Sequence, residues 1–261
     1  MSGGYLHLGS RWTGKTTGHE ACRMNIGGNA GAAGSSNAHR YRRQELLMAR
    51  IAHIAAVLLV TLIAPTGASA QAAADTERDR RVQTFLDERE GSWRDLNVPE
   101  IDGRTLHELI VANGFRNAVE IGTSTGHSSI WIGWALSRTG GRLTTIEIDP
   151  RRHGIAVENF AAAGLDGVID ARLADAHELV PQLEGPIDFV FSDADKDWYI
   201  NYFDALWPKI VPGGCFTAHN VSMNQRGIRE FLDHIQHVPD AVTTIDTRSR
   251  AGLSITCKRK P

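Results

Sequence analysis

Residues Val119 to Ser129 indicate the fold most clearly, and they read Val-Glu-Ile-Gly-Thr-Ser-Thr-Gly-His-Ser-Ser. This stretch follows an apolar run and opens a segment with the residue spacing of a helix. Gly122 and Gly126 allow the backbone to turn tightly and to approach a ligand. The free N–H groups at the start of the helix can bind an anionic group. The stretch therefore predicts a strand, a ligand-binding loop and a helix. Its two glycines, four positions apart, are not the three-glycine fingerprint of dinucleotide-binding proteins.

Outward from this loop, the chain alternates between strand and helix patterns. Strands that alternate with helices of about ten or more residues predict βαβ units and a mainly parallel sheet. Two final strands without a helix between them predict an antiparallel hairpin. We therefore predict an α/β fold: a Rossmann-like, seven-stranded, mainly parallel sheet with helices on both faces and a C-terminal antiparallel hairpin. The predicted strands are 118–122, 143–148, 168–173, 187–191, 215–218, 241–245 and 253–257, and the predicted helices are 82–89, 106–113, 128–136, 151–163, 198–210 and 228–237.

The N-terminal part of the chain has a different composition and lacks this alternation of strand and helix patterns. Residues 1–47 are rich in glycine and show no apolar period, so we expect them to be disordered or a mis-annotated extension of the gene. Residues 48–70 have the pattern of a signal peptide. A basic start at Met48 precedes an apolar run of 14 residues and an Ala-Ser-Ala cleavage motif that ends at Ala70. The run is short for a membrane helix, and a short anchor or a buried helix is the alternative interpretation.

Cleavage after Ala70 would leave an N-terminal helical segment, 71–96, and one domain, 97–261. Such a protein would be exported, periplasmic or secreted, with no stable membrane span; if the signal is not used, it would be cytoplasmic. The mature chain would keep Cys215 and Cys257. Their strands are expected to be neighbours, so a bridge between them can form, but two cysteines make no disulfide framework and the pattern favours buried free thiols.

Two features bear on phosphates and nucleic acids. Residues 9–16 fit the phosphate-loop pattern G-x-x-x-x-G-K-[ST], but no buried strand precedes them and no helix pattern follows, so we interpret the match as chance. Residues 1–47 hold six basic and two acidic side chains, a net charge of +4, which leaves −6 for the remainder within the total of −2. An acidic domain gives no electrostatic reason to expect nucleic acid, so we predict no such partner.

A second element supports the ligand-binding loop. Glu147 lies near the end of the second predicted strand, 21 residues beyond Gly126. An acidic side chain in this place can accept hydrogen bonds from both hydroxyls of a ribose. The alternative interpretation is a solvated acid at a strand end. Together the loop and Glu147 predict a nucleoside-containing ligand.

Polar side chains also gather where the fourth and fifth predicted strands end. The fourth is followed by Asp193-Ala-Asp-Lys196-Asp, and the fifth by His219-Asn220. Ligands of open α/β sheets bind at the carboxyl ends of the strands, so both clusters would face the same crevice. Asp193, His219 and Asn220 offer ligands to one divalent cation. Lys196 can act as a base if a metal or burial lowers its pKa. A solvated turn is the alternative interpretation.

In combination, the loop 119–129, the run Thr145–Pro150, the Asp193–Asp197 cluster and His219-Asn220 resemble the catechol and caffeoyl-CoA O-methyltransferase family. These are class I methyltransferases that use S-adenosylmethionine (SAM). The resemblance covers roughly residues 97–261 in the same order and spacing. It implies a methyltransferase domain there, and family members are often dimers, which implies a homodimer.

The resemblance also implies roles for single residues. The loop would hold the methionine end of SAM, Glu147 the ribose, and the residues after the third strand the adenine. Asp193 and Asn220 would bind Mg²⁺ or a similar cation, and Lys196, beside Asp193, would be the general base. The metal would lower the pKa of an aromatic hydroxyl, whose oxygen would attack the methyl group in line. The implied SAM contacts are Glu120, Gly122, Thr123, Gly126, Ser128, Glu147, Ala176, His177 and Asp193.

One residue departs from the family, which usually has Asp where this chain has His219. A neutral imidazole in place of a carboxylate favours Mn²⁺, Fe²⁺ or Zn²⁺ over Mg²⁺, or means that no metal binds. The leading prediction is an enzyme that methylates a hydroxyl of a small phenolic or catechol-like substrate with the help of a divalent metal. The alternatives are a SAM-binding protein without turnover and a metal-independent methyltransferase that acts on another nucleophile. Export conflicts with the use of SAM, which is made in the cytosol.

Overall fold

A computed structural model of the chain describes residues 66–261 and, for the side chains, residues from 71 onward. The predicted segment 1–47, the phosphate-loop match at 9–16 and most of the predicted signal peptide lie outside the described residues. Among the residues described, no helix is both long and apolar enough to cross a membrane.

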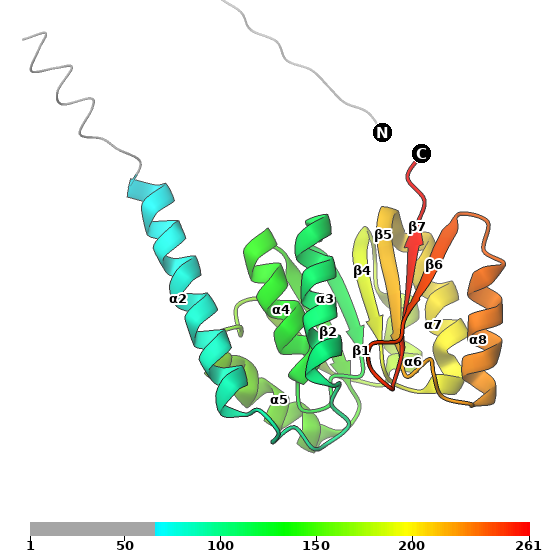
Figure 1. Cartoon of the computed structure of the whole chain (residues 1–261), viewed down its shortest axis with the longest axis horizontal. Helices are drawn as coiled ribbons and strands as arrows, with labels where there is room; N and C mark the ends of the chain where they lie inside the picture. Colours follow the sequence, from blue (N-terminus) through cyan, green and yellow to red (C-terminus); the bar gives the residue numbers. More distant parts are fainter. Residues whose placement is uncertain (1–65) are drawn as a thin grey trace, which may run out of the picture. The chain divides into compact units, whose positions relative to one another are not determined.

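A seven-stranded sheet forms the centre of the domain, with the strand order β3-β2-β1-β4-β5-β7-β6 (Figure 1). The five strands from β1 to β5 run parallel, whereas β7 pairs antiparallel with both β5 and β6. This arrangement confirms the predicted fold class, including the C-terminal antiparallel hairpin. The strands are β1 (Asn117–Ile121), β2 (Arg142–Glu147), β3 (Ile169–Leu173), β4 (Ile187–Ser192), β5 (Ile210–His219), β6 (Ala241–Asp246) and β7 (Leu253–Lys258).

Helices cover both faces of the sheet. One apolar cluster joins the sheet to α2, α3, α4 and α5, and a second joins it to α6, α7 and α8 (Figure 1). Alternate residues of β4 serve the two clusters, since Phe189 and Phe191 face the first and Val190 the second. The helices are α2 (Thr66–Glu88), α3 (Glu100–Asn113), α4 (His127–Thr139), α5 (Pro150–Ala163), α6 (Ala176–Leu179), α7 (Tyr199–Leu206) and α8 (Arg226–Gln236).

Local sequence explains where these helices begin and end. Asp149 caps the start of α5 by accepting hydrogen bonds from the backbone N–H groups of Arg151 and Arg152, and Pro150 takes the first helical position. Gly164 ends α5 with a φ of 74°, which only glycine adopts without strain. The same rules explain why the predicted and observed bounds of α5 agree closely.

The structure differs from the prediction around α7 and β5. The predicted helix 198–210 is a short α-helix between two 3-10 turns, Lys196–Trp198 and Trp207–Lys209. Strand β5 begins at Ile210, five residues earlier than expected, because an irregularity in its pairing with β4 accommodates the Pro-Gly-Gly segment 212–214. The short helix α6 was not predicted, since four residues are too few to show a period.

The prediction of free thiols is wrong: Cys215 and Cys257 form a disulfide. The antiparallel register of β5 and β7 sets these two residues directly opposite each other, with their Cα atoms 4.0 Å apart. Two cysteines 42 positions apart in the chain do not reveal this register, which depends on the strand order. The bridge ties the last strand of the chain to the strand that carries His219.

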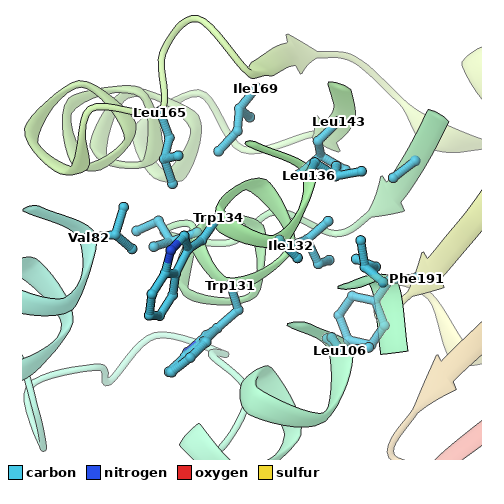
Figure 2. Close-up of a cluster of buried hydrophobic side chains, with 14 of the residues drawn as sticks. Val82, Leu106, Trp131, Ile132, Trp134, Leu136, Leu143, Leu165, Ile169 and Phe191 are labelled. Atoms are coloured by element: carbon cyan, nitrogen blue, oxygen red, sulfur yellow. The ribbon is translucent and has the colours of Figure 1, made fainter. Parts of the chain in front are cut away.

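Helix α4 occupies the middle of the first apolar cluster, and Figure 2 shows how side chains converge on it from the sheet and from α2. Trp131 and Trp134 pack with their ring centroids 5.6 Å apart. The indole N–H of Trp134 donates to Asp79 Oδ1 at 2.5 Å, and Arg138 pairs with the same carboxylate at 2.7 Å. Helix α2 is therefore anchored by both apolar and charged contacts to the helix that follows the ligand-binding loop.

Candidate active site

A cavity of about 610 Å³ opens at the carboxyl ends of the parallel strands. Gly122 after β1, Glu147 at the end of β2, Asp193 after β4 and His219 at the end of β5 all line it. This is the edge at which open α/β sheets bind ligands. Eight of the predicted site residues lie around this cavity: Gly122, Glu147, Ala176, His177, Asp193, Lys196, His219 and Asn220.

The loop after β1 approaches the neighbouring strand end very closely. Gly122 has a φ of 99°, and a Cβ atom there would lie 2.9 Å from the backbone of Asp193. Gly126 has a φ of 96°, and a Cβ atom there would lie 2.5 Å from the ring of Phe160. Both positions therefore require glycine for its conformation and for its size.

Glu147 is held firmly at the rim of the cavity. Its Oε2 accepts a hydrogen bond from the backbone N–H of Ser124 at 2.7 Å. Its Oε1 accepts from the N–H groups of Ile148 at 3.1 Å and Asp149 at 2.9 Å. Three backbone donors thus orient one carboxylate that is 7% exposed, so Glu147 presents a fixed acceptor to a ligand.

Glu120 lies behind the loop and not in the cavity. The hydroxyls of Ser128, at 2.5 Å, Ser129, and Thr145, at 2.6 Å, donate to its carboxyl group. Burial raises the pKa of Glu120 to about 7, against the opposing effect of these hydrogen bonds. Four residues predicted as SAM contacts do not line the cavity: Glu120, Thr123, Gly126 and Ser128.

A flat aromatic surface lies at the end of the cavity near β3. Asp175 caps helix α6 by accepting from the N–H of His177 at 2.9 Å. The imidazole ring of His177 stacks on Trp198, with the centroids 3.9 Å apart and the planes 20° apart. Ala176 and His177 reach the cavity where they were predicted, and Trp198 fixes the orientation of the His177 ring.

At the opposite end, four charged side chains form one chain of hydrogen bonds. His219 Nε2 lies 2.9 Å from Asp102 Oδ2, and His219 Nδ1 lies 3.1 Å from Asp193 Oδ2. Lys196 Nζ donates to the other oxygen of Asp193 at 2.7 Å. The order is therefore Asp102, His219, Asp193, Lys196, with alternating charge. The side chains of Asp102 and His219 are each 4% exposed.

The hydrogen bonds of His219 determine its charge. Both ring nitrogens lie within hydrogen-bond distance of a carboxylate oxygen, and ionised carboxylates only accept hydrogen bonds, so the doubly protonated ring satisfies both contacts. Burial by itself would lower the pKa of His219, but the hydrogen bonds to Asp102 and Asp193 outweigh burial and raise the pKa to about 9. The raised pKa favours the protonated ring at neutral pH.

The three residues predicted as metal ligands come together, but they do not fit a divalent cation. An imidazolium has no lone pair to offer, because both nitrogens of His219 are protonated. Lys196 and His219 each make a hydrogen bond to one oxygen of Asp193, so a cation at Asp193 would have to compete with both contacts. Within the part of the chain that the structure describes, no group of three or more His, Cys, Asp or Glu side chains is arranged for a metal.

Sequence reasoning missed Asp102. It lies in the first turn of α3, 117 positions before His219, and it precedes the helix start that the apolar period predicted. An acid in a first helical turn is an ordinary feature, so no local signal marks it. Asp102 does not line the cavity itself, and the unpredicted residues that do include Leu96, Asn97, Ser124, Ile148, Arg152, Tyr202, Met223 and Gln225.

Comparison with known proteins agrees with this geometry. Residues 119–221 match the methyltransferase domain family. A catechol O-methyltransferase of Niastella koreensis is 36% identical over 130 residues, which cover 48% of this chain and 58% of that protein. Caffeoyl-CoA O-methyltransferase 2 of Eucalyptus globulus is 32% identical over 138 residues, 51% of this chain and 56% of that protein. The chain thus spans a little over half the length of these two relatives.

Solved structures extend the comparison to the fold. The O-methyltransferase from Bacillus cereus in complex with S-adenosylhomocysteine (SAH) is 27% identical, with a TM-score of 0.59, over 69% of this chain and 91% of that chain. The O-methyltransferase TomG from Streptomyces achromogenes in complex with SAM is 27% identical, with a TM-score of 0.58, over 69% and 90%. The chain is therefore similar in sequence to catechol and caffeoyl-CoA O-methyltransferases, and similar in fold to O-methyltransferases solved with SAH or SAM.

Proposed function

We propose that this protein transfers the methyl group of SAM to a hydroxyl group of a small phenolic or catechol-like substrate. The observation that carries the proposal is that Glu147 and the Asp193–Lys196 pair line one cavity of about 610 Å³. A cavity of several hundred Å³ is typical of small-molecule sites. It offers a fixed acceptor at one end and a proton acceptor at the other.

The cofactor would lie along the strand ends. The carboxylate of Glu147 would accept hydrogen bonds from the ribose hydroxyls, and its three backbone donors keep it in place. Ala176 and the stacked ring of His177 would contact the adenine, a flat group that matches a flat surface. Gly122 would let the backbone approach the methionine end. This orientation would direct the sulfonium toward Asp193 and Lys196.

The transfer itself needs an in-line approach and the removal of one proton. The substrate oxygen forms a bond to the methyl carbon while the bond from that carbon to sulfur breaks, and SAM becomes neutral SAH. The hydroxyl proton passes to Lys196 Nζ, which lies on Asp193 at 2.7 Å and is thereby oriented. The amine must be unprotonated at that moment to accept the proton.

Apolar side chains around the cavity agree with a ligand that has flat apolar groups. Leu96, Ile148 and Met223 line the cavity and remain largely exposed. Large apolar side chains exposed beside a polar site are typical of surfaces that contact a ligand. The names of the relatives also point to phenolic acceptors. We derive no step through a divalent cation, because the donor set does not fit one.

The compartment remains part of the proposal. The predicted signal at 48–70 and the disulfide between Cys215 and Cys257 both agree with export to an oxidising compartment. An exported enzyme would need SAM from the cytosol. Fractionation of the native cells, with N-terminal sequencing of the protein, tests this: a cytosolic protein that keeps residues before Gln71 would contradict export.

The central experiment has two arms. Calorimetry should show SAH binding to the purified protein, and SAM labelled on its methyl group should transfer label to members of a phenol and catechol panel. Binding of SAH without transfer to any acceptor would indicate a binding protein without turnover. Transfer to amines, thiols or carboxylates, but not to hydroxyls, would indicate a methyltransferase for another nucleophile.

A further inference from the structure

We propose that the His219 side chain, held between Asp102 and Asp193, takes the place of a divalent cation, so that methyl transfer by this protein needs no metal. The proposal rests on the proposed function. It also assigns to Asp102, through His219, a positioning role that the family resemblance did not indicate.

The first argument is geometric. The imidazole lies between two carboxylates, 2.9 Å from one and 3.1 Å from the other, and it is 3% exposed. Each nitrogen therefore points at an acceptor, and neither can face an incoming metal ion. A metal could bind to His219 only after a buried hydrogen bond to Asp102 or Asp193 had broken and the ring had lost a proton.

The second argument is the charge of the site. The related family usually has a carboxylate at this position, with a charge of −1, whereas the doubly protonated ring of His219 carries +1. The ring lies between the carboxylates of Asp102 and Asp193, and Lys196 Nζ donates to the remaining oxygen of Asp193, so each of these groups has a partner without any ion. An added divalent cation would face a buried positive charge.

The third argument concerns what the cation does for the reaction. His219 lines the cavity beside Lys196, so its positive charge lies near the oxygen that becomes negative as the proton leaves. A positive charge held in place near a developing anion stabilises that anion. Tyr199 holds the backbone in place by donating from its hydroxyl to the carbonyl of His219 at 3.1 Å and to that of Ser192 at 2.9 Å.

The first test uses the unaltered protein. Its methyl-transfer rate should stay the same after exhaustive dialysis against a chelator and after addition of Mg²⁺ or Mn²⁺. Electron paramagnetic resonance of Mn²⁺ should show no bound ion in the complex with SAH. Loss of activity on chelation that a divalent cation restores, or one Mn²⁺ bound per chain, would overturn the proposal.

A second test uses variants. His219→Asp returns the carboxylate of the family, so it should bind one Mn²⁺ per chain and become dependent on it. His219→Asn removes the positive charge without adding a ligand charge, so it should lose activity whether or not metal is present. His237→Asp, a change at an exposed histidine of the same chain, is the control and should behave as the unaltered protein. Mn²⁺ dependence absent from His219→Asp, while the protein folds, would count against the charge argument.

A third measurement does not depend on any variant. Nitrogen-15 NMR of the histidine rings at neutral pH should show both nitrogens of His219 protonated in the complex with SAH. A bare nitrogen at His219 would overturn the proposal. Because Mn²⁺ binding and ring protonation are read without an acceptor substrate, they remain decisive if no methyl transfer is found, and only the proposed function would then fail.

Discussion

At the scale of single residues, Lys196 is the side chain placed to receive the proton of an acceptor hydroxyl. Its Nζ lies 2.7 Å from Asp193 Oδ1 and 3.1 Å from the carbonyl oxygen of Ala194. General bases typically contribute about 10²–10⁴-fold to a rate. We expect Lys196→Ala to lower kcat by about that factor while SAH affinity stays within about twofold. Steady-state kinetics and calorimetry check this, with the exposed Lys260→Ala as control, and full activity would assign the proton transfer elsewhere.

Glu147 allows a second prediction at this scale. Replacing its carboxylate by an amide, in Glu147→Gln, removes the charge that would accept from the ribose and weakens the three backbone contacts. Hydrogen bonds to charged groups are worth about 1.5–3 kcal/mol, so the Kd for SAH should rise about 10- to 100-fold. Glu158→Gln, at an exposed position of α5, should leave the Kd unchanged. Equal affinities of the two variants would remove Glu147 from the proposed cofactor site.

The raised pKa of His219 has a consequence for stability. The pKa of His219 is about 9 in the folded protein, whereas the ordinary pKa of a histidine is 6.5. Protonation of His219 therefore stabilises the fold fully below pH 6.5, and this contribution is lost as the pH rises through 9. The difference corresponds to about 3 kcal/mol in the free energy of unfolding. Urea unfolding at pH 6.5 and pH 9 should show this loss, and His219→Gln should lack most of it.

The variant is necessary because Glu120 acts in the same direction. Burial raises the pKa of Glu120 from 4.5 to about 7. The protonated carboxyl group therefore stabilises the fold at low pH, and this contribution is lost as the pH rises from 4.5 through 7. This window lies mostly below that of His219. A pH dependence between 7 and 9 that persists unchanged in His219→Gln would show that another group titrates there.

At the scale of elements, the strand ends bring the site together. Strands β1, β2, β4 and β5 each end in a residue or loop that lines the cavity, because parallel neighbours end at the same edge. Helix α3 adds Asp102 from outside this pattern. The sequence could predict the strand-end residues, since each follows an apolar run, but it could not predict which helix would supply the acid opposite His219.

The disulfide between β5 and β7 gives a prediction at this scale. It joins residues 42 positions apart, and closing a loop of that length in the unfolded chain is worth about 4 kcal/mol. A reducing agent should therefore lower the free energy of unfolding by several kcal/mol. The double variant Cys215→Ala, Cys257→Ala should resemble the reduced protein and should not respond to the reductant. Identical unfolding curves with and without reductant would indicate that the bridge does not form.

At the scale of the whole molecule, the described part of α2 belongs to the domain through its second half. Val82, Phe85 and Leu86 are buried against the first apolar cluster, whereas residues 71–74 are exposed. The contacts of this helix with the core therefore begin after the predicted cleavage point at Ala70. A mature chain that begins at Gln71 stays a prediction, and it would keep all three of these buried side chains.

Truncation of the chain tests where the part needed for stability begins. A protein that starts at Gln71 should unfold at the same temperature as the full chain and bind SAH equally well. A protein that starts at Gly91 loses three buried side chains, each worth about 1.5–3 kcal/mol, and leaves Trp134 without Asp79. We expect it to be markedly less stable or to aggregate. Thermal unfolding followed by circular dichroism compares the full chain with the two truncated proteins. A loss of stability on removal of residues 1–70 would contradict the assignment.

The sequence by itself determined the fold class and the place of the ligand site. Apolar periods mark the seven strands, and the glycines at 122 and 126, with Glu147 and Asp193 after their strands, mark the edge where a ligand binds. These features are local, so each can be found within a short window of the chain. What the sequence could not show was how residues far apart in the chain pair with one another.

The tertiary structure decided those pairings. The register of β5 against β7 turns two expected free thiols into a disulfide, and the packing of α3 brings Asp102 to within 2.9 Å of His219. Because of its contact with Asp102, His219, which the sequence predicted as a metal ligand, lies between two carboxylates. The physical reason is that the charge state of a buried side chain depends on its partners, and only the folded chain determines which partners meet.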